Sequence, residues 1–105
     1  MALKVEVSAS CEIDLEQAYQ WYESHRAQLG LEFLNDFDER LNLIAVNPYI
    51  GAEVYRQTRK FVMTRFPYII YYLLTDDHVK VVACLHGGLD PRLSAGTVHN
   101  RIIEQ

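Results

Sequence analysis

Four basic side chains gather in one part of this chain, and a histidine follows them after two apolar segments. Between residues 54 and 75 the sequence has no acidic residue, and its basic residues are Arg56, Arg59, Lys60 and Arg65. His86 ends a later apolar run, and Glu53 lies just before the basic stretch. Cations stabilise the charge that grows on a phosphate in a transition state, and an imidazole or a carboxyl group can transfer the proton. Arg65 and His86 are therefore candidate residues for chemistry on a phosphate group.

The same residues also have structural interpretations. Arg65 can pair with a surface carboxylate, and His86 at the end of a strand can bond the backbone of the turn at Gly87 or Gly88. Lys60 and Arg65 are expected on opposite faces of one strand, so the alternation does not bring them together. Structural roles are also expected for three isolated histidines, His25, His78 and His99.

The segment that must position these residues is a pair of apolar runs. In Tyr68–Leu74 both alternating faces are apolar, so the strand must be covered on both sides and is expected at the centre of a sheet. The polar residues 75–78 predict a hairpin turn into a second strand. Its two faces are expected to carry Val79, Val81, Ala83 and Leu85 on one side, and Lys80, Val82, Cys84 and His86 on the other.

The residues before this hairpin predict a strand followed by two helices. Residues 3–7 alternate apolar and charged side chains, and the hydroxyls of residues 8–10 can cap a helix. Gly30 is expected to separate the two helices, and Asn47-Pro48 ends the second one. Each helix has one apolar stripe: Leu15, Ala18, Tyr19 and Tyr22 in the first, and Phe33, Leu34, Phe37, Leu41 and Ile44 in the second.

These elements predict a single α+β domain over residues 1–105. An N-terminal strand and an antiparallel helical hairpin pack on a twisted antiparallel sheet, and residues 92–105 form a tail with a loop and a short helix. Pro67 is expected in the turn before the central strand. Trp21 lies off the apolar stripe of its helix, so it is either a boundary residue that packs on a neighbour or a contact for a partner.

Charge and composition narrow the function classes. The net charge is −4, and nine acidic residues lie between Glu12 and Glu53, which argues against docking of the whole surface on nucleic acid. Cys11 and Cys84 have no metal or CxxC spacing, so they are expected to be reduced thiols, with no metal or cofactor. The longest apolar run, Tyr68–Leu74, is too short to span a bilayer, and no leader is recognised. We expect a cytoplasmic protein.

Three motifs together resemble the RelE/ParE toxin superfamily over about residues 4–91. They are Asn47-Pro48-x-x-Gly51, Phe66-Pro67-Tyr68-x-Ile70-x-Tyr72 and His86-Gly87-x-x-Asp90-Pro91. The resemblance implies a toxin of a type II toxin–antitoxin or plasmid-stabilisation module, held inactive by a cognate antitoxin whose C-terminal segment wraps it. It also implies one of two activities, ribosome-dependent cleavage of messenger RNA or inhibition of DNA gyrase.

The sequence favours the ParE-like activity, inhibition of DNA gyrase. Many members of the superfamily carry arginines after His-Gly, whereas this chain has Gly88-Leu89. An acidic chain is also poorly suited to docking on ribosomal RNA, where phosphate neutralisation dominates affinity. The alternatives are a RelE-like endoribonuclease that uses Arg65 and His86, a non-toxic binding module of the same fold, or a ligand-binding domain outside the superfamily. The residues expected to bind the antitoxin or the target are Trp21, Arg56, Arg59 and Lys60.

Overall fold

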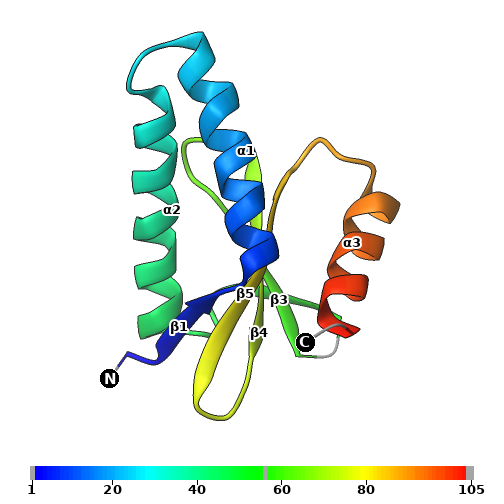
Figure 1. Cartoon of the computed structure of the whole chain (residues 1–105). Coiled ribbons are helices and arrows are strands. Elements are labelled where there is room, and N and C mark those ends of the chain that lie inside the picture. The colour runs from blue at the N-terminus through cyan, green and yellow to red at the C-terminus, as the bar shows by residue number, and fades with distance from the viewer. Residues whose placement is uncertain (1, 56, 104–105) are drawn as a thin grey trace.

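The computed structural model describes residues 2–55 and 57–103. It has one sheet with a layer of helices on each of its two faces (Figure 1). The elements in chain order are β1 (Lys4–Val7), α1 (Ala9–His25), α2 (Leu29–Val46), β2 (Ala52–Tyr55), β3 (Thr58–Val62), β4 (Tyr68–Leu74), β5 (His78–His86) and α3 (Pro91–Ile103). The predicted α+β class, with an N-terminal strand followed by a helical hairpin, is confirmed.

The sheet has the strand order β1-β5-β4-β3-β2, so β4 is central, as its two apolar faces predict. We call the face with Ile70 and Tyr72 the first face, and the face with Ile69, Tyr71 and Leu73 the second face. The pairs β2–β3, β3–β4 and β4–β5 are antiparallel, whereas β1 runs parallel to β5 and makes the sheet mixed. Alternation along β1 predicts a half-buried strand but carries no information about the direction of its partner.

One prediction about β5 is wrong, because the strand contains a bulge. Tyr71 pairs with Ala83 while Tyr72 pairs with Val81, which leaves Val82 as an extra residue. An extra residue moves every later side chain to the opposite face. Val79 and Val81 therefore lie on the first face, whereas Ala83 and Leu85 pack on the second face.

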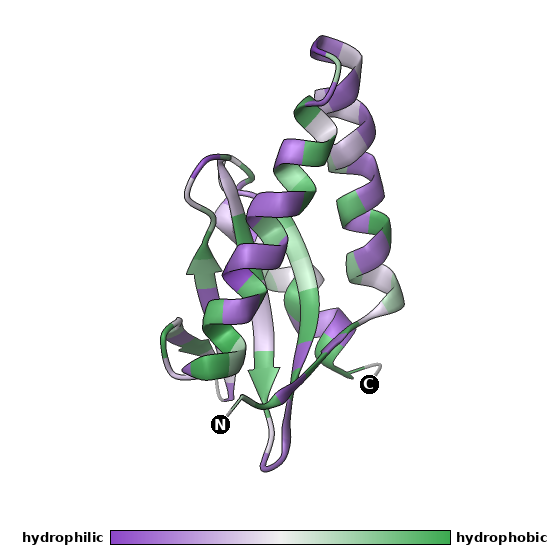
Figure 2. Ribbon diagram, turned by 90° about the vertical axis from the view of Figure 1, so that its left-hand side faces the viewer, coloured by the Kyte–Doolittle hydropathy of each residue, from purple (hydrophilic) through white to green (hydrophobic). Residues whose placement is uncertain are grey.

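The helical hairpin covers the first face with a continuous core. Phe33, Ile44, Ile70 and Tyr72 are fully buried there, and Phe37 is nearly so. Figure 2 shows hydrophobic colour along the central strands and hydrophilic colour on much of the hairpin surface. The tip of the helical hairpin extends past the ends of the strands (Figure 1).

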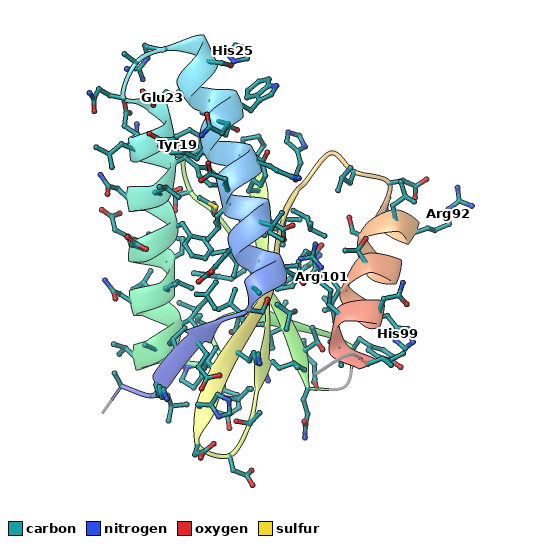
Figure 3. The ribbon with its side chains drawn as sticks, in the orientation of Figure 1. Tyr19, Glu23, His25, Arg92, His99 and Arg101 are labelled. Carbon is teal, nitrogen blue, oxygen red and sulfur yellow. The ribbon has the colours of Figure 1, made fainter. Side chains whose placement is uncertain are left out.

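The two helices are held together at the tip by Glu23 and Gly30. The Glu23 carboxylate accepts hydrogen bonds from the amides of Gln28 (3.0 Å) and Gly30 (2.9 Å), which satisfies donors at the start of α2. The helix break lies at residues 26–28, and Gly30 belongs to the first turn of α2 instead of separating the helices. A Cβ atom at Gly30 would lie 2.6 Å from the Tyr19 ring, so glycine permits the close approach of the helices. Tyr19 and Glu23 are labelled in Figure 3.

The second face is covered by α3, which is longer than the short helix expected in the tail. The helix begins at Pro91, and the Asp90 carboxylate accepts a hydrogen bond from the Arg92 amide (2.9 Å), as an N-cap residue does. Val98 and Ile102 lie four residues apart on the face that packs against Val82 and Ala83. Because only these two apolar residues of α3 join the second-face cluster, the tail has no regular apolar stripe.

Candidate functional site

A cleft separates α1 from the C-terminal end of β5, and we call it the α1–β5 cleft. Its volume is about 640 Å³, and its walls come from α1, the turn before β4 and the end of β5. Trp21 and His86 both line it, together with Tyr68 and Leu89. The fold thus brings together two of the predicted site residues that lie 65 positions apart in the sequence (86 − 21).

Trp21 lies at the rim of this cleft with more than half of its surface exposed. The next residue, Tyr22, points into the core, where its ring contacts Phe33 and Phe66. Trp21 therefore projects outward, with its ring 4.0 Å from the ring of His25 and 57 % of the residue accessible to solvent. A large amphipathic ring in this position combines apolar contact area with an N–H donor, which suits a partner interface.

His86 is exposed, and its ring is oriented by the turn that follows β5. Its Nδ1 accepts a hydrogen bond from the Gly88 amide at 2.8 Å, and its ring lies 5.2 Å from the Tyr68 ring. Because Nδ1 is the acceptor, the neutral ring carries its hydrogen on Nε2. This is the turn-backbone contact expected of a histidine at a strand end.

The sequence predicted that Arg65 lies in the same strand as Lys60, and this prediction is wrong. β3 ends at Val62, and Arg65 lies in the turn before β4, where its guanidinium forms an ion pair with Glu32 of α2 at 2.6 Å. Its backbone amide donates to Asp36 at 3.2 Å. Hydrogen bonds from Arg65 and Arg26 hold the pKa of Glu32 below its usual value. Arg65 therefore ties the turn to α2, in agreement with its structural interpretation.

Arg59 and Lys60 lie on opposite faces of β3, and only one of them has a partner. Arg59 donates to the carbonyl of Gly51 at 2.7 Å, and its guanidinium lies 5.0 Å from the centre of the Tyr49 ring. Lys60 is exposed on the second face, and among the described residues no hydrogen bond or ion pair involves its ammonium group. Arg56 lies outside the residues that the structure describes. Glu53 lies on β2 opposite Arg59.

Residues of the three sequence motifs form hydrogen bonds that connect separate segments of the fold. Tyr72 donates its hydroxyl hydrogen to the carbonyl of Pro48 at 2.7 Å, and its oxygen accepts from the amide of Gly51 at 3.0 Å. A Cβ at Gly51 would lie 2.7 Å from the same hydroxyl. The Gly87 amide donates to the carbonyl of Pro67 at 2.7 Å. These contacts of the motifs therefore join parts of the fold.

The two cysteines are buried free thiols within the first-face core. Burial raises the pKa of Cys11 to about 12 and also raises that of Cys84, with nearby Asp14 adding to both effects. The Cys84 sulfur lies 3.9 Å from the sulfur of Met63. Both thiols are therefore protonated at neutral pH and unsuited to nucleophilic chemistry.

An ion pair between Asp14 and Arg101 is the main feature that sequence reasoning missed. The guanidinium makes a bidentate contact with the carboxylate at 2.6 Å and 2.9 Å, and the same group donates to the carbonyl of Val82 at 2.9 Å. The carboxylate also accepts from the Cys84 amide at 3.0 Å. Figure 3 shows Arg101 extending from α3 toward α1. The pair thus joins α1, α3 and the bulged edge of β5, and no local sequence signal predicts a contact over 87 positions.

Within residues 2–55 and 57–103, no cluster of three or more histidine, cysteine or acidic side chains is arranged to hold a metal ion. No helix in the same ranges is long and apolar enough to cross a bilayer.

The fold is a small α+β domain in which a helical hairpin covers one face of a five-stranded sheet. A family model described as the ParE toxin of the type II toxin–antitoxin system parDE matches residues 5–91. The chain belongs to this family.

Two solved structures share the fold. A chain of the chromosomal ParDE system from P. aeruginosa superposes with a TM-score of 0.72 at 13 % identity, covering 81 % of this chain and 96 % of that one. A double arginine-to-alanine mutant of the E. coli toxin RelE in the free state gives 0.56 at 16 % identity, covering 99 % and 97 %. No curated protein matches the chain.

Proposed function

We propose that this protein is the toxin of a type II toxin–antitoxin module, that it inhibits DNA gyrase by binding it in the cytoplasm, and that a cognate antitoxin neutralises it. Membership of the ParE family supports the toxin role. The P. aeruginosa neighbour comes from a ParDE system, which supports an antitoxin partner.

The observation that carries the choice of activity is the dispersal of the cations. A ribonuclease must place several cations around one phosphate, together with an acid and a base. Here Arg65 pairs with Glu32, and Arg59 holds the backbone of Gly51 on the other face of β3 from Lys60. Inhibition by binding needs only a shaped surface, and the α1–β5 cleft with Trp21 supplies one.

One observation favours the alternative activity. Lys60 and His86 both line a groove between α3 and the second face, so one cation and one imidazole share a space there. A single lysine leaves most of the charge on a transferring phosphate uncompensated. We therefore keep the endoribonuclease as the second candidate.

The experiment compares two assays on the purified full chain. Gyrase supercoiling is expected to be inhibited, and message bound to translating ribosomes is expected to stay intact. Trp21→Ala is expected to weaken gyrase inhibition about tenfold, because a large aromatic at a cleft rim is the typical hot spot. Ile13→Ala is the matched control, since Ile13 is an equally exposed apolar residue of α1 outside the cleft.

The double variant Arg65→Ala with His86→Ala separates the two activities. In a gyrase inhibitor these side chains are at most contact residues, so most of the growth inhibition is expected to remain. Loss of a catalytic cation or acid would instead lower a cleavage rate about 10²- to 10³-fold. Message cleavage within minutes of induction that disappears in the double variant would reject gyrase inhibition in favour of the ribonuclease.

The antitoxin is tested in growing bacteria by expressing this chain with and without the gene adjacent to it. Growth arrest that the neighbouring gene relieves, with a complex recovered on purification, is the expected result. If the chain alone has no effect on growth, gyrase or message, the binding-module interpretation replaces the toxin.

A further inference from the structure

A second groove lies between α3 and the second face of the sheet, and we call it the α3 groove. It has a volume of about 680 Å³, within the range of about 300–1,000 Å³ that is usual for small-molecule sites. Its apolar walls include Ile69 and Tyr71 of β4 and Val98 of α3. Small residues of α3 leave the space open: Ser94, Ala95 and Gly96.

The lining of the groove includes a buried hydroxyl group without a partner. Thr58 of β3 is 1 % exposed, and its Oγ1 makes no hydrogen bond with any residue that the structure describes. A buried polar atom without a partner is costly and rare in native proteins, so each instance calls for an explanation. A ligand atom that exchanges a hydrogen bond with this hydroxyl supplies one.

The described lining of the α3 groove carries a lysine and no acidic side chain, although the protein as a whole has a net charge of −4. Lys60 lies two residues after Thr58 on the same face of β3, which places the two side chains next to each other. The other ionisable side chains of the described lining are Tyr55, Tyr71, His86 and His99, and none of the described lining residues is acidic. Arg92 belongs to the same helix but points away from the sheet (Figure 3) and pairs with Asp90 at 3.2 Å. The groove therefore combines apolar walls with a cationic corner.

We propose that the α3 groove binds a small molecule with an apolar body and one carboxylate. The apolar body lies between α3 and the side chains of Ile69 and Tyr71. The carboxylate pairs with the ammonium group of Lys60 and accepts the hydrogen of the Thr58 hydroxyl. The α3 groove shares His86 and Leu89 with the α1–β5 cleft, but Trp21 does not line it, and the proposal does not depend on the proposed target or antitoxin.

The test is a titration followed by amide NMR of the full chain, with 3-phenylpropionate as the probe. The expected result is saturable shifts of the amides of Thr58, Lys60, Tyr71 and Val98. The matched control is 3-phenylpropionamide, which has the same body without the charge. We expect the amide to bind about tenfold more weakly, since it lacks the ion pair.

Variants assign the contacts. Lys60→Met keeps the length of the side chain and removes its charge, so it should bind the acid and the amide with equal affinity. Thr58→Val removes the unpaired hydroxyl, so the free protein should melt no lower than the parent while the probe binds more weakly. Ala95 shares its side of α3 with Pro91 and His99, which also line the groove, so Ala95→Phe should block the groove and abolish the shifts. Gly96→Ala should leave the shifts unchanged, because Gly96 is exposed on the same side of the helix as Arg92.

Three results would overturn the proposal: no saturable shifts in the groove, equal affinity of the parent for acid and amide, or unchanged binding to Ala95→Phe. The amide spectrum and the melting curve of each variant report whether it is folded. If Ala95→Phe does not fold, the comparison of acid with amide on the parent and on Lys60→Met decides alone.

Discussion

The two faces of the sheet are closed in different ways. On the first face, two helices bury a continuous set of aromatic and aliphatic side chains, and Phe33, Ile70 and Tyr72 have no exposed surface. On the second face, one helix contributes Val98 and Ile102 to a small cluster and leaves the α3 groove beside it. The first face therefore has the larger buried core, whereas the second face keeps the α3 groove, with the exposed Lys60 in its lining.

The helices on the two faces are also attached to the sheet by different interactions. The hairpin α1–α2 is held by apolar packing along its length, but α3 depends on the ion pair of Arg101 with Asp14 as well as on its narrow apolar contact. Packing is insensitive to charge, whereas a partly buried ion pair fails when either partner is lost. This contrast can be tested one face at a time.

The largest effect is expected from a charge on the first face. Ile70→Asp places a carboxylate among fully buried apolar side chains, which should cost several kcal/mol and unfold a domain of ordinary stability. Ile69→Asp is the matched substitution on the second face, where the side chain is only partly buried beside the groove. We expect circular dichroism to show an unfolded Ile70→Asp protein and a folded but less stable Ile69→Asp protein. Equal melting temperatures for the two variants would show that the faces contribute equally.

The second effect concerns the attachment of α3. Asp14→Asn removes the carboxylate charge that pairs with the Arg101 guanidinium, which is only 19 % exposed, and this should cost about 3 kcal/mol. Hydrogen exchange of the α3 amides should accelerate more than that of α2. A double variant with Arg101→Leu should recover part of the loss, because no unpaired charge remains. A single variant in which α2 and α3 lose protection equally would mean that α3 unfolds only with the rest of the domain.

Much of this fold can be predicted from the sequence, because its signals are local. The two-sided apolar run at Tyr68–Leu74 identifies the central strand, and proline at Pro48 and Pro67 marks the end of a helix and a turn. The bulge at Val82 escapes prediction, since any apolar residue there fits either face. The parallel pairing of β1 escapes it for a similar reason, because alternation does not encode strand direction.

The candidate site is less predictable than the fold. Trp21 was identified by its position off the apolar stripe, and the structure places it with His86 at one cleft. Arg65 and Arg59 differ in their surroundings only through contacts with Glu32 and Gly51, which lie elsewhere in the chain. Residue type cannot reveal which cation is already paired. The unpaired hydroxyl of Thr58 is likewise visible only in the folded chain.

A smaller effect on stability is expected from replacing two glycines, one in a closely packed place and one in open space. At Gly30 a Cβ atom would lie 2.6 Å from the ring of Tyr19 and 2.8 Å from its carbonyl oxygen, so Gly30→Ala must separate the helices. We expect a loss of about 1–3 kcal/mol. At Gly96 the new methyl meets nothing, and Gly96→Ala should instead stabilise the protein by up to about 1 kcal/mol, since alanine is the better helix former. Urea denaturation of both variants measures the difference, and the same sign for both would contradict the contrast in packing.

The smallest effect tests the tie between the turn before β4 and α2. The pKa of Glu32 is lowered by hydrogen bonds from Arg65 and Arg26, so its folded-state pKa lies below that of the unfolded chain. A lowered carboxyl pKa contributes stability above the unfolded pKa, about 4.3, and this contribution is lost as the pH falls through the folded-state pKa. Because the pair is exposed and screened by solvent, Glu32→Gln should lower the melting temperature at pH 7 by no more than about 2 °C. The difference from the parent should vanish once the pH has fallen below the folded-state pKa, and 1 M salt should reduce it at pH 7. A loss that persists unchanged at low pH would show that Glu32 acts through packing, and that Arg65 is not held by charge.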